Sequence, residues 1–126
     1  MEKFSAEEYS ELSEIIVQLT KHLPYPIAEW GGVTFLWNDK ITLDSGKMGK
    51  FRYYQPHRIV IAGHMRPAGV RHVISIVVHE LTHMYQFQHN PVRYALCAVP
   101  LIRKYTLEPM AYDNEEAAYE TMQREF

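Results

Sequence analysis

The sequence predicts a single α+β domain with a short, mostly antiparallel sheet, a central helix and a C-terminal helix. Three observations support this fold class: apolar residues at helical spacing near the N-terminus, several short β-prone runs between positions 33 and 62, and a longer apolar helix over positions 69–88. The 126 residues are the usual size of one domain, so we expect residues 1–126 to share one core.

Composition and charge exclude some classes of protein. Hydrophobic residues make up 47% and charged residues 22% of the chain, which is ordinary for a globular protein and unlike a disordered one. The 13 basic and 15 acidic residues give a net charge of -2, and we interpret them as spread along the chain. Without a basic stripe to neutralise phosphates, nucleic acid is not an expected partner.

The cysteine count and the apolar runs bear on location. Cys97 is the only cysteine, so we expect no disulfide framework and a reducing, cytoplasmic environment. The N-terminus is acidic and lacks the apolar core of a signal peptide, and no apolar run approaches the roughly 20 residues of a membrane span. We expect the longest run, 94–102, to be buried, with contact to a membrane surface as the alternative.

The first helix has a recognisable start and end. Ser5 and Glu8 have the spacing of a capping box, and Pro24 and Pro26 end the helical pattern. Apolar residues at helical spacing predict one buried face between these signals. They are Tyr9, Leu12, Ile15, Ile16, Leu19 and Leu23.

Three short runs then have the composition of strands. They cover positions 33–37, 51–54 and 58–62, and the segments between them contain glycine and proline. Connections of this kind favour hairpins or a small antiparallel sheet over long parallel strands.

Two further helices follow. Positions 69–88 contain no proline and no internal glycine, and apolar residues recur there on more than one side, so this helix should run through the middle of the domain. Asn90 and Pro91 end it. Pro109 suits a first helical position and begins the last predicted helix, over 109–123.

The central helix carries the pattern His-Glu-Leu-Thr-His at positions 79–83. Residues four apart lie on one helix face, so His79 and His83 can offer imidazole nitrogens to one metal ion. Glu80 projects about 100° away and can reach a metal-bound water without being a ligand. Two ordinary core histidines are the alternative, but burying them with a glutamate and no metal would be costly in desolvation. The pattern therefore predicts a metal-dependent hydrolase.

A catalytic zinc takes three protein ligands and keeps one position for water, so a third ligand is needed. Four downstream residues are candidates. Glu115 is preferred, because it falls within an apolar stripe of the last helix and a carboxylate there needs a charged partner. Glu116 shares a polar face, and Glu108 precedes Pro109 as a helix-start residue. His89 stands six residues after His83, but the position where a glycine would turn the chain back is glutamine.

With these residues the chain resembles the zincin superfamily of metallopeptidases, and within it the gluzincins, whose third ligand is a glutamate on a later helix. Positions 79–86 carry the first likeness, and positions 114–119 resemble the Asn-Glu-x-x-Ala-Asp/Tyr ligand helix. The strand-like segments before the central helix resemble those of SprT-like and minimal gluzincin domains. The resemblance covers positions 33–120.

The resemblance implies a zincin-like domain that binds one zinc ion per chain and hydrolyses peptide bonds in a peptide or protein substrate. Its ligands would be His79, His83 and Glu115, and Glu80 would act as general base. The run 58–62 would be an edge strand beside the metal cleft, where an extended substrate could pair. The group that stabilises the oxyanion is left open among four side chains. They are Tyr105, Tyr112, Tyr119 and His89.

Two other functions remain open. A fourth protein ligand would close the site and make the chain a non-catalytic, zinc-stabilised binding module. A zinc hydrolase of a non-peptide amide is the other, because fold-level likeness does not separate substrates. Glu80 favours a hydrolase, since a closed structural site needs no base. The oligomeric state and any need for a partner chain are not predicted.

Overall fold

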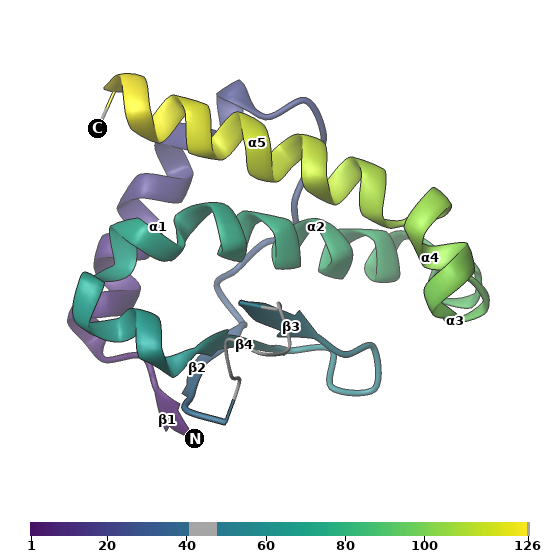
Figure 1. The fold of residues 1–126 in the computed structure, drawn as a ribbon, viewed down its shortest axis with the longest axis horizontal. Helices are drawn as coiled ribbons and strands as arrows, with labels where there is room; N and C mark the ends of the chain where they lie inside the picture. The colour runs from purple at the N-terminus through teal and green to yellow at the C-terminus, as the bar shows by residue number, and fades with distance from the viewer. Residues whose placement is uncertain (41–47, 126) are drawn as a thin grey trace.

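The computed structural model describes residues 1–40 and 48–125, and the α+β class is confirmed. A small sheet lies on one side of the helix α2 (Ile74–His89), and the helix α5 (Glu108–Glu125) lies on the other (Figure 1). The two helices run antiparallel, so the start of α5 lies near the end of α2 (Figure 1). Helix α2 is therefore the middle layer, as the sequence predicts.

The sheet has four strands in the order β1-β2-β4-β3. They are β1 (Glu2–Lys3), β2 (Thr34–Asn38), β3 (Gly49–Phe51) and β4 (Arg58–Ala62). Two of the three pairings are antiparallel, but the central pair, β2 with β4, is parallel, so the sheet is mixed. The chain reaches β3 after β2 and then turns back into β4, which makes β4 parallel to β2.

Two expectations about these strands are wrong. The run 51–54 enters the sheet only through Phe51, because the chain then turns toward β4, and Arg58 N–H donates to the Gln55 carbonyl in that turn. The run 58–62 is not an edge strand, since β4 lies between β2 and β3. The edge nearest α2 is β3, which packs against that helix.

Helix α1 (Ala6–Leu19) has the predicted start. The Ser5 hydroxyl accepts from the Glu8 amide at 3.0 Å and the Glu8 carboxylate accepts from the Ser5 amide at 2.8 Å, which completes the capping box. The helix continues as a 3₁₀ turn, Thr20–His22, before Pro24. Its buried face packs into the core that the sheet and α2 share.

The approach to α2 is less regular than predicted. Two 3₁₀ segments, Gly63–Ala68 and Val70–Val73, precede it, so regular α-helix begins at Ile74 and not at position 69. Gly69 separates the two segments with φ of 95°, a left-handed conformation that glycine adopts without strain. From Ile74 onward α2 is buried on most of its circumference.

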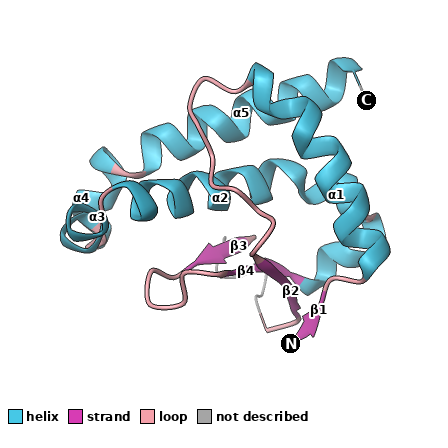
Figure 2. Ribbon diagram, turned by 180° about the vertical axis from the view of Figure 1, so that it is seen from behind, coloured by secondary structure: helices cyan, strands magenta, loops and turns pink. Residues whose placement is uncertain are grey.

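Two short helices, not predicted from the sequence, follow α2. These are α3 (Pro91–Cys97) and α4 (Pro100–Thr106), each with proline in its first turn, where the missing N–H costs nothing. They form a hairpin at one end of the molecule (Figures 1 and 2). The expectation that positions 94–102 are buried is wrong, because only Tyr94 of that run is buried.

The apolar stripe expected on α5 is buried only in part; its members are Ala111, Tyr112, Ala118, Tyr119 and Met122. Its fully covered positions recur at spacings of four and three along the helix, and Leu107 precedes them in the same series. The series is Leu107, Ala111, Asn114, Ala118 and Thr121. Tyr112 and Tyr119 are exposed, so they do not belong to this face. Small residues at the contact allow α5 to lie close to α2, and large tyrosines are kept at its margin.

Candidate metal centre

His79 and His83 lie on the face of α2 that meets the start of α5. Their Nε2 atoms are 3.2 Å apart, and the rings meet edge to face. The His83 ring is fully buried and the His79 side chain is 10% exposed. The predicted convergence of two imidazole nitrogens is therefore present.

Glu108, at the first position of α5, supplies the third donor in this cluster. One carboxylate oxygen lies 2.7 Å from His83 Nε2, and the other lies 3.4 Å from His79 Nε2. One donor atom from each of the three residues lies within 4.8 Å of the other two. These are the residues that could hold a metal ion together.

The spacing of the two histidines suits a tetrahedral ion. Nitrogen ligands about 2.05 Å from zinc lie about 3.3 Å from one another at a tetrahedral angle. The distance of 3.2 Å between His79 Nε2 and His83 Nε2 matches this value. Glu108 presents a different oxygen to each ring, Oε2 to His79 at 3.4 Å and Oε1 to His83 at 2.7 Å.

Glu115, the preferred third ligand, lies on the opposite side of the His79 ring. Its carboxylate is 2.8 Å from Nδ1, and the Nε2 atom of the same ring faces His83 and Glu108. The contact is short but does not have hydrogen-bond alignment, which leaves the buried Nδ1 without an aligned acceptor. From this position Glu115 can hold the His79 ring from behind the cluster, as outer carboxylates do for ligating histidines.

The other two candidates lie away from the cluster. Glu116 is exposed on α5, as its polar face predicts. His89 is the last residue of α2, and its ring stacks on Tyr85 with centroids 5.0 Å apart. Because α2 continues through Gln86 without a turn, His89 is carried past the histidine pair.

A repeated pattern explains why sequence alone preferred Glu115. Glu108 and Glu115 each begin the pattern Glu-x-x-Ala-Tyr, seven residues apart. Seven residues are close to two helical turns, so the two glutamates share a face, with their Cα atoms about 10 Å apart along the axis. The pattern identifies the helix face. Only the position of α5 along its axis, relative to α2, selects Glu108 over Glu115 as the third donor.

The buried side-chain amide of Asn114 helps to fix the position of α5 along its axis. The Asn114 side chain donates to Thr82 Oγ1 on α2 at 2.9 Å and to the Tyr25 carbonyl at 3.1 Å. Its carbonyl oxygen accepts from the Tyr25 amide at 3.0 Å. These bonds tie α5 to α2 and to the loop after α1, and Asn114 is fully buried among them.

Gln86 fixes the tautomer of the neutral His83 ring. Its Nε2 donates to the Leu107 carbonyl at 2.9 Å, and its Oε1 lies 2.8 Å from His83 Nδ1. A carbonyl can only accept, so the Leu107 contact fixes which end of the amide faces His83. The amide oxygen also only accepts, which places a proton on His83 Nδ1. The neutral ring therefore presents its Nε2 lone pair to the cluster.

Arg103 holds Glu108 from the other side. Its Nε donates to the Glu108 carboxylate at 2.8 Å, and its Nη1 donates to the Tyr94 hydroxyl at 3.1 Å. Arg103 belongs to α4, so the hairpin after α2 contributes directly to the position of the third donor.

The protonation equilibria follow from these contacts. Burial disfavours the charged form of His79, but the close carboxylates of Glu108 and Glu115 outweigh this effect and raise the His79 pKa to about 9. Burial opposes ionisation of Glu108, but its contacts with His79 and His83 hold its pKa well below the usual range. The shifts favour a charged His79 imidazolium beside an ionised Glu108 carboxylate.

Glu80 lies in a closed environment next to the sheet. Burial raises the pKa of its carboxyl, and the neighbouring His83 and His79 oppose that rise. Strand β3 passes against it at Gly49, where an added Cβ would lie 3.3 Å from Glu80 Cγ and 2.7 Å from Ile76 Cγ2. A side chain at Gly49 would displace α2 or Glu80, so the absence of a Cβ brings the edge strand up to the site.

Tyr112 lies over the outer part of the site. Its ring meets that of His79 edge to face with centroids 4.8 Å apart, and the side chain is half exposed. Tyr105 and Tyr119 are exposed on α4 and α5, and His89 stacks on Tyr85. Of the four side chains considered for the oxyanion, Tyr112 is the one that contacts a cluster histidine.

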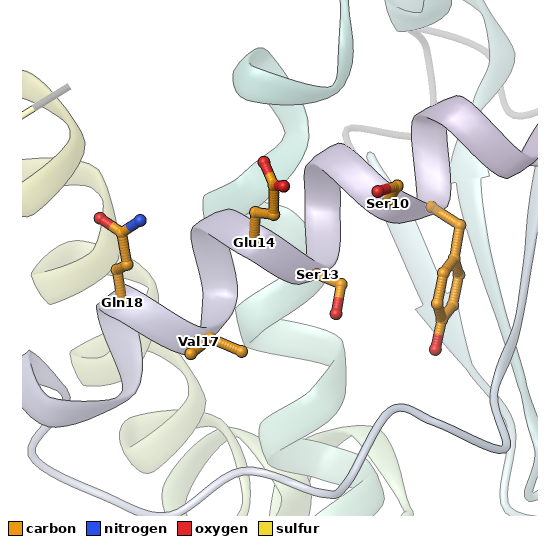
Figure 3. A pocket seen from close by; sticks show the side chains of 6 residues that line it. Ser10, Ser13, Glu14, Val17 and Gln18 are labelled. Atoms are coloured by element: carbon orange, nitrogen blue, oxygen red, sulfur yellow. The ribbon is translucent and has the colours of Figure 1, made fainter.

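A hollow on the outer face of α1 has no part in this centre. It is an open depression of about 740 Å³ along the outer face of α1, lined by residues between Tyr9 and Gln18 (Figure 3). Side chains of one helix face form it, without a buried polar group from another element, so we assign it no function.

Comparison of the chain with protein-family models, curated proteins and solved structures finds no match. In the part of the chain that the structure describes, no helix is both long and apolar enough to cross a membrane.

Proposed function

We propose that this chain is a zinc-dependent peptidase whose metal ligands are His79, His83 and Glu108. The observation that carries the proposal is the convergence of two imidazole nitrogens and one carboxylate, with one donor atom of each residue within 4.8 Å of the other two. Glu115 is reassigned from ligand to outer partner of His79 because it faces Nδ1.

The chemistry divides between the metal and the chain. A zinc ion held here supplies a Lewis acid for the substrate carbonyl and a water of lowered pKa. Glu80, one residue after the first ligand, accepts the proton of the attacking water and passes it to the leaving amine. Its surroundings are nearly dry, and the pKa raised by burial makes the carboxylate a stronger base than a solvated one.

The edge strand supports a peptide over a smaller amide. Strand β3 packs against α2 and passes Glu80 at Gly49. An extended peptide that pairs with the outer edge of β3 would run along α2 with a peptide bond beside Glu80. Tyr112 contacts His79 and is half exposed, so its hydroxyl is our candidate donor to the oxyanion.

The competing function is a zinc-stabilised binding module, which would need a fourth protein ligand to close the site. Within residues 1–40 and 48–125, the cluster contains three donor residues. Three protein ligands leave one position for water, which favours a catalytic centre.

Glu80→Gln tests the catalytic assignment. The amide keeps the shape of the carboxylate but accepts no proton, so we expect peptide hydrolysis to fall by roughly 10² to 10⁴-fold while zinc content stays at one ion per chain. Hydrolysis is measured on a casein or peptide-library substrate, and zinc by atomic absorption. Glu116→Gln, an exposed change on α5, is the matched control and should keep full activity.

Either of two results would overturn this proposal. A Glu80→Gln variant as active as the wild type removes Glu80 from the mechanism. A wild type that binds zinc tightly but hydrolyses no substrate of the library supports the binding module.

A further inference from the structure

The α3–α4 hairpin, residues 91–106, exposes more large apolar side chains than a water-facing element needs. Six of them are between 45% and 73% exposed. They are Val92, Leu96, Val99, Leu101, Ile102 and Tyr105. Exposed apolar side chains concentrated on one short segment indicate a candidate interaction site.

These side chains form faces and are not scattered. Val92 and Leu96 are four residues apart on α3, and Leu101 and Tyr105 are four apart on α4, so each pair shares one side of its helix. The hairpin lies at the extreme end of the molecule in both views (Figures 1 and 2). The apolar residues are therefore presented on a projection.

The charged residues of the hairpin itself are all basic. Positions 81–107 contain Arg93, Arg103 and Lys104 but no Asp or Glu, whereas the acidic residues, apart from Glu80, fall in positions 2–44 and 108–125. Arg93 and Lys104 are exposed, so the tip is cationic although the chain carries a net charge of -2.

Aromatic residues add to the same end. Lys104 Nζ lies 5.6 Å from the centroid of the Tyr105 ring. In the β3–β4 loop, Tyr53 contacts Tyr94 of α3 at 6.3 Å between centroids, and Arg52 and Tyr54 beside it are exposed. Tyrosine prefers the boundary between water and lipid, because its ring is apolar and its hydroxyl polar.

From these observations we infer that the α3–α4 hairpin docks on a membrane surface that contains anionic lipid. The apolar side chains would enter the outer acyl region, and Arg93, Lys104 and Arg52 would contact lipid phosphates. A projecting tip without carboxylates suits a negatively charged fluid surface. The inference uses no property of the metal centre, so it stands or falls separately from the proposed peptidase activity.

The test is co-sedimentation of the full chain with vesicles. Vesicles of phosphatidylcholine alone are compared with vesicles in which about a third of the lipid is phosphatidylglycerol. We expect binding to the anionic vesicles that is at least tenfold stronger and that weakens as salt is raised, since the attraction between charges is screened. Replacement of Leu96 and Leu101 together by glutamate should lower the binding at least tenfold, because it removes two apolar side chains and adds two repelled charges.

Val17→Glu is the matched control. Val17 is also an exposed apolar residue, 58% accessible, but it lies on α1 toward the other end of the molecule (Figure 1). This variant should bind vesicles as the wild type does. Circular dichroism and the melting temperature of each variant check that the fold is kept, and Arg93→Gln with Lys104→Gln tests the charges without adding acids.

Three results would overturn the inference. They are no binding of the wild type to anionic vesicles, equal binding of the Leu96 and Leu101 double variant, and equal loss with Val17→Glu. A wild type that stays off vesicles but dimerises in light scattering, while the double variant stays monomeric, would assign the surface to a second copy of the chain.

Discussion

The two turns of α5 that carry Glu108 and Glu115 have the same residue pattern but different neighbours. Glu108 contacts the Nε2 atoms of both histidines and is held by Arg103. Glu115 contacts only the outer nitrogen of His79, and its side chain is 37% exposed. The Glu108 carboxylate is enclosed by Arg103 and the two histidine rings. The Glu115 carboxylate lies at the margin of the site.

The difference shows that a metal ligand is selected by its position along the helix axis as well as by the helix face on which it lies. The Asn114 side chain lies between the two turns and ties α5 to Thr82 and to Tyr25. A shift of α5 by two turns would exchange the two glutamates, but these buried hydrogen bonds oppose such a shift. Substitutions of Glu108, of Glu115 and of the residues that position α5 and His83 test this difference.

Glu108→Ala should have the largest effect. Loss of a direct ligand should weaken zinc binding by more than the roughly 100-fold upper value for outer partners, or about 2.7 kcal/mol. Competition with a chromophoric chelator measures the affinity. Wild-type protein should also gain thermal stability from added zinc, because the ion binds the folded state, and this variant should not. A variant with unchanged affinity would return the third ligand to Glu115.

Asn114→Ala should have the second-largest effect. It should lower the stability of the fold and should not remove a zinc ligand. It removes three hydrogen bonds of a buried side chain at about 1 kcal/mol each, so we expect the free energy of unfolding to fall by about 2 to 3 kcal/mol. Urea denaturation of the metal-free protein measures it. Asp113→Ala, at an exposed position beside it, should change stability by less than about 0.5 kcal/mol. Equal stability of the two variants would mean that Asn114 does not hold α5 in place.

Gln86→Leu should weaken zinc binding by about 10- to 100-fold, because His83 loses the acceptor that keeps its proton on Nδ1. Nitrogen NMR of the histidine rings gives a second measurement. The neutral His83 ring should carry its proton on Nδ1 in the wild type and lose that preference in the variant. Gln86→Glu keeps an acceptor oxygen and should retain more of the affinity. A proton found on Nε2 in the neutral wild-type ring would contradict the assignment.

Glu115→Gln should have the smallest effect on the centre. We expect zinc binding to weaken by about tenfold or less, the lower end for outer partners, because the amide still reaches His79 and the group is partly exposed. Glu116→Gln, one position farther round α5, should leave the affinity unchanged. If Glu115→Gln releases zinc as completely as Glu108→Ala does, both carboxylates act as ligands and the comparison between the two turns fails.

Local patterns were sufficient for the longer elements of the fold. The capping box at Ser5 and Glu8, the apolar spacing of α1 and the run 58–62 each depend on neighbours in sequence, and each element formed where it was predicted. The hairpin of α3 and α4 escaped prediction, because apolar residues usually indicate burial, yet here they face outward. Burial depends on what covers a segment, and sequence pattern does not report that.

The candidate site, too, could be predicted from the sequence only in part. The sequence by itself determined that His79 and His83 share a face and that Glu80 lies beside them, because helix geometry follows from spacing within one segment. Only the tertiary structure decided between Glu108 and Glu115, and only it placed Gln86, Arg103 and Gly49 around the centre. Those contacts join residues from separate elements, so they depend on how α4, α5 and β3 pack against α2, which no local spacing specifies.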